Sequence, residues 1–131
     1  MSEDIFDYSR FVQAHADILE LLDNDTTETA LSEALEAMHT SLQQQFAKEE
    51  QAMQTAQFGP LADHKKDHDQ ALERLSARIA KWHETHDRQA LLEYLEGPFS
   101  DWFVRHVNTR DFITAQRLDR KSTRLNSSHR L

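Results

Sequence analysis

Apolar residues recur at every third or fourth position in four separate stretches of the chain, which is the period of an amphipathic α-helix. The stretches cover residues 8–22, 31–56, 61–82 and 91–113. In each of them the apolar positions form one face, and polar residues occupy the opposite face. Four such helices joined by short links predict an all-α fold, an antiparallel up-down-up-down four-helix bundle.

The links between the four stretches carry residues that end or begin helices. Residues 24–27, 58–60 and 85–87 form the three expected turns. In the first turn, Asp25 or Thr26 is expected to cap the second helix by accepting a hydrogen bond from its unpaired backbone N–H groups. In the second turn, a glycine followed by a proline is typical of one helix ending and the next beginning.

Proline also occurs inside the fourth stretch, directly after Gly97. Pro98 has no backbone N–H, and its ring clashes with the preceding helical turn. We therefore expect a short helix, a kink at this point, and then a longer helix. The longer helix is predicted to direct Trp102, His106 and Ile113 toward the core.

Composition supports the helical prediction and excludes several kinds of site. The 131 residues include only two glycines and two prolines, fewer than the many turns of a sheet protein require. The absence of cysteine excludes disulfides, thiolate metal sites and cysteine nucleophiles. No apolar run approaches the ~18 residues of a membrane helix, and no secretory signal is recognisable, so we expect a cytoplasmic location and no membrane partner.

Charge divides the chain into two regions. The net charge is −8, which argues against nucleic acid and anionic membranes as partners. The last twelve residues, 120–131, nevertheless contain four basic residues and no acidic ones, and they show no helical period. We expect residues 1–119 to form the bundle and residues 120–131 to be a basic tail, disordered and of non-native origin.

Each apolar stripe is interrupted near its middle by polar side chains that can bind a metal. The interrupting residues are His15 in the first stripe, Gln45 and Glu49 in the second, His64 and His68 in the third, and His106 in the fourth. A single buried histidine is usually explained by one hydrogen bond. In an antiparallel bundle, however, all four interruptions meet in one layer, where unpartnered burial costs several kcal/mol per group. A metal centre offsets that cost, and nitrogen and carboxylate ligands without sulfur suit iron, manganese or zinc.

Asp111 does not fit the stripe by helical spacing alone. It follows His106 by five residues, which places it about 140° around a regular α-helix. Either Asp111 is an ordinary solvated aspartate, or a local distortion of the helix turns its carboxylate toward the centre.

These motifs resemble those of the hemerythrin family in its short bacterial form, over residues 5–118. The family has one histidine on the first helix, H-F-x-x-E-E on the second, H-x-x-x-H on the third and H-[IV]-x-x-x-D on the fourth. The chain has His15, then QFAKEE at residues 45–50, H-x-x-x-H at residues 64–68 and HVNTRD at residues 106–111.

The resemblance implies a non-haem di-iron protein that binds dioxygen reversibly and is not an enzyme. It implies two iron ions, cycling between Fe²⁺ and Fe³⁺ and joined by an oxo or hydroxo bridge. One iron would take the three histidines of the third and fourth helices, and the other would take His15 and residue 45. Glu49 and Asp111 would bridge the two ions, and Phe46 and Trp102 would form the pocket wall.

Position 45 departs from the family pattern, because glutamine stands where the family has histidine. An amide oxygen coordinates metal more weakly than imidazole, and the amide nitrogen does not coordinate. We therefore expect the second iron to be held less firmly than the first.

Three functions remain open from the sequence. The first is storage, delivery or sensing of dioxygen, by a chain that resembles monomeric family members and has no catalytic residues. The second is an iron protein that senses or scavenges nitric oxide, peroxide or a redox partner through its altered second site. The third is a metal-free helical interaction module. A ferritin-like oxidase is excluded, because it needs two inward E-x-x-H motifs and the chain has one, at residues 36–39, whose histidine faces outward.

Overall fold

A computed structural model describes residues 6–57, 59 and 61–118 of the chain. The described residues form five α-helices and one short π-helix, and no strand occurs among them. In chain order the elements are α1 (Ser9–Asp23), α2 (Glu28–Thr55), α3 (Leu61–Thr85), α4 (Arg88–Glu96), α5 (Pro98–His106) and the π-helix η1 (Val107–Asp111). Helical turns continue from η1 through residue 118.

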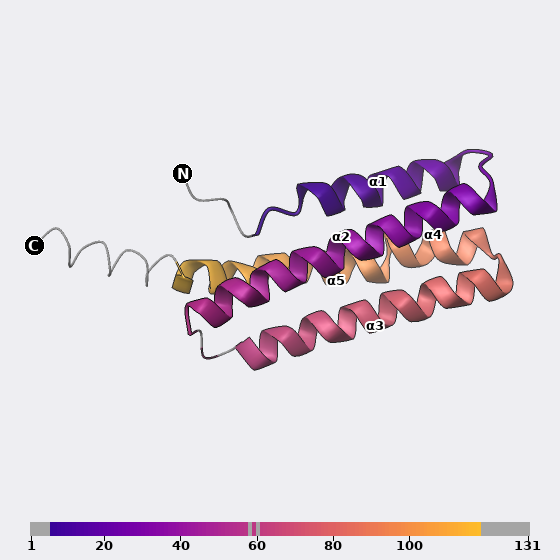
Figure 1. The fold of residues 1–131 in the computed structure, drawn as a ribbon. Helices are drawn as coiled ribbons and strands as arrows, with labels where there is room; N and C mark the ends of the chain where they lie inside the picture. The colour runs from indigo at the N-terminus through magenta and orange to yellow at the C-terminus, as the bar shows by residue number, and fades with distance from the viewer. Residues whose placement is uncertain (1–5, 58, 60, 119–131) are drawn as a thin grey trace, which may run out of the picture.

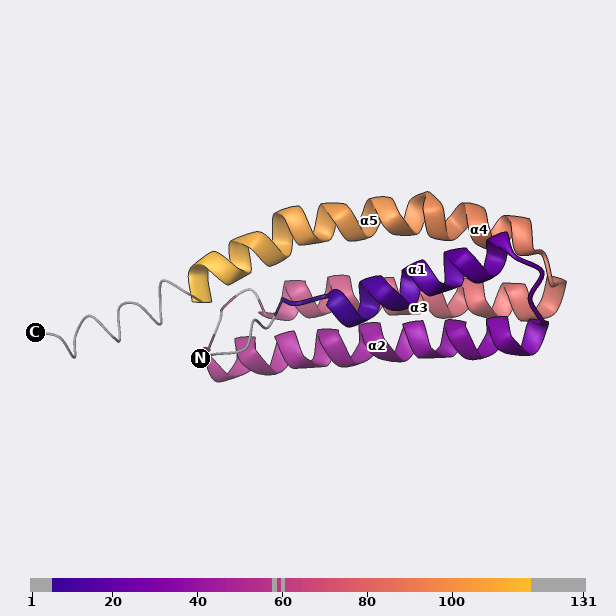
Figure 2. The same cartoon turned by 90° about the horizontal axis from the view of Figure 1, so that it is seen from above.

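The elements form four antiparallel legs, with α4, α5 and η1 together making the fourth (Figure 1). Each of α1, α2 and α3 packs against the next helix in the chain, and α4 closes the bundle by contacting both α3 and α1. Figure 2 shows the fourth leg lying along α1 and α3, opposite α2. The predicted all-α, up-down-up-down bundle is confirmed.

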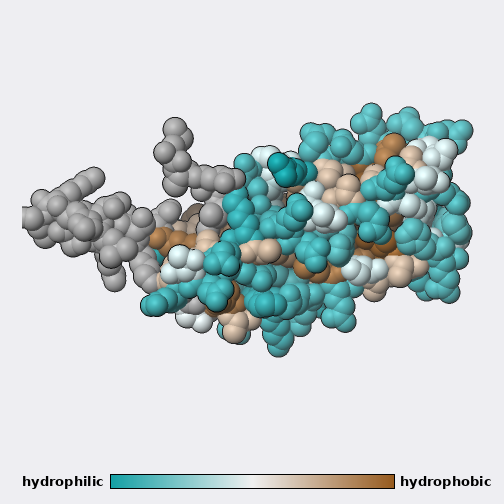
Figure 3. All heavy atoms as spheres, viewed as in Figure 1, coloured by the Kyte–Doolittle hydropathy of each residue, from teal (hydrophilic) through white to brown (hydrophobic). Residues whose placement is uncertain are grey.

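The apolar stripes of the legs meet in one continuous core. Its fully buried members include Ile18 of α1, Leu35 of α2, Leu75 of α3 and Leu95 of α4. Burying each such side chain stabilises the fold by roughly 1.5–3 kcal/mol. On the face drawn in Figure 3, hydrophilic residues cover most of the surface and the hydrophobic ones lie in patches between the helices.

The helix boundaries follow the expected turns, with one change of cap. The Oγ1 atom of Thr27 accepts a hydrogen bond from the backbone N–H of Ala30 at 3.1 Å, so Thr27 caps α2, and not Asp25 or Thr26 as predicted. Thr27 has an extended backbone, which holds its hydroxyl over the first turn. Asp87 caps α4 in the same way, by accepting from Ala90.

The predicted interruption at Gly97 and Pro98 is confirmed, because α4 ends at Glu96 and α5 begins at Pro98. The backbone of Gly97 passes so close to the preceding turn that a Cβ atom there would lie 2.9 Å from the carbonyl oxygen of Glu93. Glycine is therefore the residue that fits this junction without a steric clash.

Beyond His106 the helix has a wider turn than predicted, and this changes which residues face the core. The five-residue π-helix η1 contains one residue more than an α-helical turn needs. As a result Thr114 is 3% exposed, whereas Ile113 is 49% exposed. The prediction that Ile113 faces inward is wrong, because it assumed an unbroken α-helical period.

The predicted basic tail, residues 120–131, lies outside the described residues, and so does the proposed boundary at residue 119. Among the helices that the structure describes, none combines the length and the apolar character needed to cross a membrane.

Candidate metal centre

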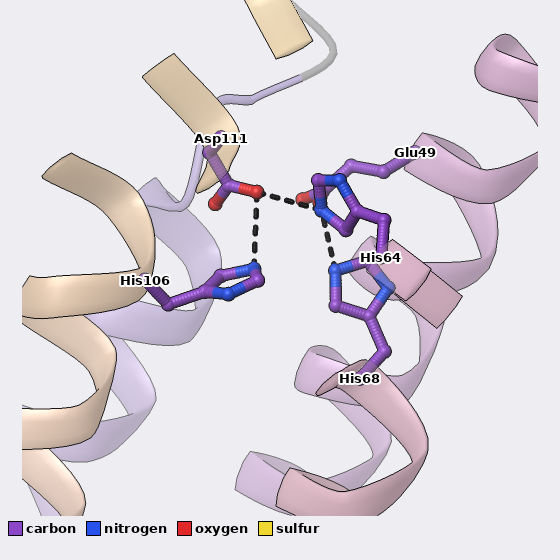
Figure 4. A group of neighbouring side chains, drawn as sticks. All are labelled: Glu49, His64, His68, His106 and Asp111. Carbon is purple, nitrogen blue, oxygen red and sulfur yellow. Dashed lines mark ion pairs between the residues drawn. The ribbon is translucent and has the colours of Figure 1, made fainter. Parts of the chain in front are cut away.

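Five buried side chains from three legs of the bundle point toward one another (Figure 4). We call them the metal cluster: Glu49 of α2, His64 and His68 of α3, His106 of α5, and Asp111 of η1. One ligand atom from each lies within 4.8 Å of the ligand atoms of all the others. No member is more than 5% exposed. Five of the residues predicted as metal ligands are therefore brought together.

The local helical geometry explains how each leg contributes. His64 and His68 are four residues apart, which places both imidazoles on one face of α3. On the fourth leg, η1 begins directly after His106 and ends with Asp111. Because a π-helix closes its hydrogen bonds between residues five apart, it turns Asp111 onto the face of His106. Local distortion, and not solvation, is therefore the correct interpretation of Asp111.

The ligand atoms of the metal cluster lie close to one another. Oδ1 of Asp111 lies 2.9 Å from Nε2 of His64 and 3.0 Å from Nε2 of His106. Oε1 of Glu49 lies 3.2 Å from Nε2 of His68 and 3.8 Å from Nε2 of His64. Three ring nitrogens and two carboxylate oxygens thus share one small volume.

None of these five ligand atoms has a hydrogen-bond partner, although all are buried. An unsatisfied buried polar atom costs about 1–3 kcal/mol, and more when it carries charge. These five residues could hold a metal ion, which would give the buried atoms the partner they lack. The donor set of imidazole nitrogen and carboxylate oxygen, with no sulfur, fits iron, manganese or zinc.

Two further residues contact the Nδ1 atoms of His68 and His64, the ring nitrogens that point away from the metal cluster. The Nδ1–H of His68 donates to Oε2 of Glu50 at 2.8 Å, and Nδ1 of His64 lies 3.1 Å from the hydroxyl of Thr114. A carboxylate only accepts hydrogen bonds, so the His68 proton sits on Nδ1 and leaves Nε2 free to bind a metal. Sequence reasoning did not assign these roles. Glu50 is the last residue of the QFAKEE motif, so the sequence did contain a signal for it. Thr114 had no such signal, because it reaches the site only through the wider turn of η1.

Aromatic rings cover two of the histidines. The ring of Phe46 stacks on that of His68, with centroids 3.8 Å apart and planes at 2°. Trp102 stacks on His106 at 4.7 Å and 14°. Both predicted wall residues therefore contact metal-cluster histidines directly, where they restrict ring rotation.

Burial and neighbouring charges shift the ionisation of the cluster. Burial lowers the pKa of His68 to about 4, against the opposing effect of Glu50, so its imidazole is neutral at pH 7. Burial, together with the nearby Asp111 carboxylate, raises the pKa of Glu49. Burial also acts to raise the pKa of Asp111, but its contacts with His106 and His64 outweigh this effect and lower the pKa.

His15 lies outside the metal cluster. Its Nε2 atom is 3.1 Å from the backbone carbonyl oxygen of Leu95, and its ring stacks on Phe99 with centroids 5.9 Å apart. Because a carbonyl oxygen only accepts, this nitrogen carries the proton and does not offer a lone pair to a metal. The assignment of His15 as a ligand stays a prediction.

Gln45 and Tyr8 occupy the side of the site on which His15 was expected. The side-chain amide of Gln45 donates to Oε2 of Glu49 at 2.8 Å, and the Tyr8 hydroxyl donates to Oδ2 of Asp111 at 2.5 Å. Burial and the charges of Glu49 and Asp111 raise the pKa of Tyr8, so it remains a phenol. Tyr8 is the first residue of the predicted stretch 8–22, and nothing in the apolar spacing marks its hydroxyl as part of the site.

Comparison with known proteins gives results that agree with this geometry. The chain is 27% identical, over 84 residues, to the bacteriohemerythrin of Aquifex aeolicus (strain VF5). The matched part covers 64% of this chain and 64% of that protein. No solved structure matches the chain.

A family model covers almost the whole described region. The hemerythrin HHE cation-binding domain matches residues 7–118, a span that includes every member of the metal cluster. The match and the buried cluster together indicate a metal-binding protein. The chain belongs to the hemerythrin family, as a four-helix bundle that carries the HHE cation-binding domain.

Proposed function

We propose that this protein binds iron at the metal cluster and uses it to bind dioxygen. The observation that carries the proposal is the set of five buried and unpartnered ligand atoms, one from each member of the cluster. A cluster of this kind destabilises the fold unless a cation fills it. The likeness to a bacteriohemerythrin supports iron among the metals that fit the donor set.

The chain's own residues prepare the site in three ways. Glu50 holds the proton of His68 on Nδ1, so that Nε2 faces the cluster. Glu49 and Asp111 bring negative charge that balances a cation. Phe46 and Trp102 stack on the histidines and keep water away from them. Iron supplies redox chemistry and a coordination position for a small ligand when it is bound.

A second candidate ligand is nitric oxide or peroxide. It is favoured by one observation: Gln45 contacts Glu49 through its amide, and His15 contacts Leu95, so neither supplies an imidazole on that side of the carboxylates. The alternative of nitric oxide or peroxide as the ligand rests on this altered second site. The second iron, the monomeric state and the absence of enzymatic activity stay predictions.

The function is tested by metal analysis combined with ligand-binding spectra. Protein expressed with ample iron is analysed for iron content, reduced without air, and then exposed to dioxygen or to nitric oxide. We expect bound iron and a reversible spectral change with dioxygen. A change with nitric oxide alone would favour the second candidate, and protein that contains zinc only, or no metal, would contradict the proposal.

Two histidine variants make the test specific. His106→Ala removes a cluster ligand and is expected to abolish both iron retention and the spectral change. His39→Ala is the control, because His39 lies outside the cluster and contacts Ser76 at 2.9 Å. It should behave as the wild type does.

A further inference from the structure

Each carboxylate of the metal cluster has one oxygen facing the histidines and one facing away. Oδ1 of Asp111 faces His64 and His106, whereas its Oδ2 accepts the hydrogen bond of Tyr8. In the same way, Oε1 of Glu49 is turned toward the histidines, whereas its Oε2 accepts from Gln45. Both outward oxygens therefore have a hydrogen-bond donor.

This arrangement bears on how many ions the site accommodates. A carboxylate that bridges two ions gives one oxygen to each of them. Here the outward oxygens face the O–H group of Tyr8 and the N–H group of Gln45. The hydrogens of these groups carry partial positive charge, and they point toward the position that a second cation would take. A donor and a cation at the same oxygen repel each other.

The position of α1 along the bundle axis also keeps the imidazole of His15 away from the outward oxygens of Asp111 and Glu49. Tyr8 is the N-cap residue of α1, and His15 follows it by seven residues, about two helical turns or ~10 Å along the axis. Because Tyr8 is level with Asp111, His15 lies two turns away, level with Leu95 and Phe99.

Tyr8 and Gln45 also separate the carboxylates from solvent. Both line a surface depression of about 560 Å³ that includes Ser41, Gln44 and Lys48. Tyr8 itself is 7% exposed, and its ring packs edge-on against Phe103 with centroids 4.9 Å apart. The phenol is thus held firmly in place between the depression and the cluster.

We propose that the centre holds one metal ion, and that the Tyr8 hydroxyl and the Gln45 amide take the place of a second ion as hydrogen-bond donors to Asp111 and Glu49. Tyr8 and Gln45 are then positioning residues, which orient the inward oxygens without binding the metal. This inference rests on the proposed function only in requiring that the metal cluster binds a metal.

Metal stoichiometry is the first test. Metal-free protein is titrated anaerobically with Fe(II), and in parallel with Co(II), and metal per chain is measured after desalting. We expect saturation at one ion per chain for both metals. Two tightly held ions per chain would overturn this inference and leave the proposed function intact, whereas failure to bind any metal would overturn both.

Two tyrosine variants test the role of the Tyr8 hydroxyl. Tyr8→Phe keeps the ring in its packing site and removes the donor to Asp111. We expect it to bind one Co(II) with an affinity about 10-fold lower, and with a changed ligand-field spectrum. Tyr94→Phe is the matched control, since Tyr94 lies under the guanidinium of Arg78, away from the cluster, and should leave both values unchanged.

The same experiments distinguish a donor from a metal ligand. If Tyr8 coordinated iron, the Fe(III) protein would show a phenolate-to-iron absorption band in the visible region, and Tyr8→Phe would remove it. That band, or a Tyr8→Phe variant identical to the wild type, would overturn the inference. His15→Ala is expected to keep one ion and an unchanged Co(II) spectrum, and loss of the ion would also overturn it.

Discussion

The choice of ring nitrogen is the residue-scale feature on which the site depends most. His68 directs Nε2 into the metal cluster because its Nδ1–H is bonded to Glu50. Glu50 itself is partly exposed and is not a member of the metal cluster, so it acts on the site through its hydrogen bond and its charge next to His68. Residues in this position commonly change metal affinity by 10–100-fold when they are removed.

Glu50→Ala is therefore expected to lower the affinity for Fe(II) or Co(II) by about 10-fold or more, because His68 loses the partner that fixes its tautomer. Glu50→Gln keeps a hydrogen-bond acceptor for His68, so its metal affinity should fall less than that of Glu50→Ala. Affinities are measured by competition with a chelator. Glu36→Gln, an exposed glutamate elsewhere on α2, is the control; an equal loss in all three variants would contradict this role of Glu50.

The pKa of Glu49 predicts a pH-dependent stability of the metal-free protein. Burial raises this pKa above 4.5, so above pH 4.5 the unfolded chain releases a proton that the folded chain retains. The stability of the folded state therefore falls as the pH rises, by about 1.4 kcal/mol per unit of pKa difference.

Glu49→Gln removes this ionisation while keeping the shape of the side chain. In metal-free protein it should increase the free energy of unfolding by about 1–3 kcal/mol more at pH 8 than at pH 5. Denaturant unfolding with chelator at both pH values measures the difference. An equal change at the two pH values would show that Glu49 is ionised in the folded protein at both of them.

At the scale of single elements, η1 is the feature that completes the site. It carries Asp111 to the metal cluster and shifts the following turns so that Thr114 meets His64. Arg110 anchors η1 to α3 through an ion pair with Asp67, with Nε and Oδ2 2.6 Å apart. The π-helix is equivalent to one residue inserted into an α-helix.

Deleting Asn108, an exposed residue of η1, should therefore restore an α-helix and place Asp111 four residues after His106, still on the inward face. We expect this variant to retain metal within about 10-fold of the wild-type affinity. Inserting an alanine after Asn108 should instead turn Asp111 by about 100° and abolish binding. Co(II) titration measures the metal affinity of both variants. Loss of metal binding in the deletion variant alone would contradict the prediction.

At the scale of the whole molecule, the metal cluster joins three of the four legs of the bundle. A bound ion links α2, α3 and the α5–η1 leg, so it stabilises the folded state in addition to filling the site. A ligand that binds only the folded chain adds about 4 kcal/mol at a free concentration 1,000 times its Kd.

We expect removal of the metal with a chelator to lower the melting temperature by about 10 °C. His64→Ala should melt at the same temperature with and without chelator, because it binds little metal, whereas His39→Ala should show the full difference. Thermal unfolding followed by circular dichroism measures it. A wild-type melting curve that does not respond to the chelator would contradict the prediction.

The sequence by itself determined the four helical legs and most of the metal cluster. Apolar spacing decides which face of a helix is buried, so His64, His68, His106 and Glu49 had to point inward once four stripes were recognised. Asp111 required more, because helical spacing alone placed it to the side, and only the resemblance of the HVNTRD motif at residues 106–111 implied that it reaches the centre.

Only the tertiary structure decided the register of α1. A slide of seven residues, two helical turns, keeps the same face of a helix toward the core, so the apolar pattern permits either Tyr8 or His15 at the level of the carboxylates. Packing of α1 against the kinked fourth leg selects Tyr8, which bonds to Asp111, while His15 bonds to Leu95. Periodicity specifies the direction of a side chain around a helix axis, whereas its height along the axis depends on contacts with the other legs.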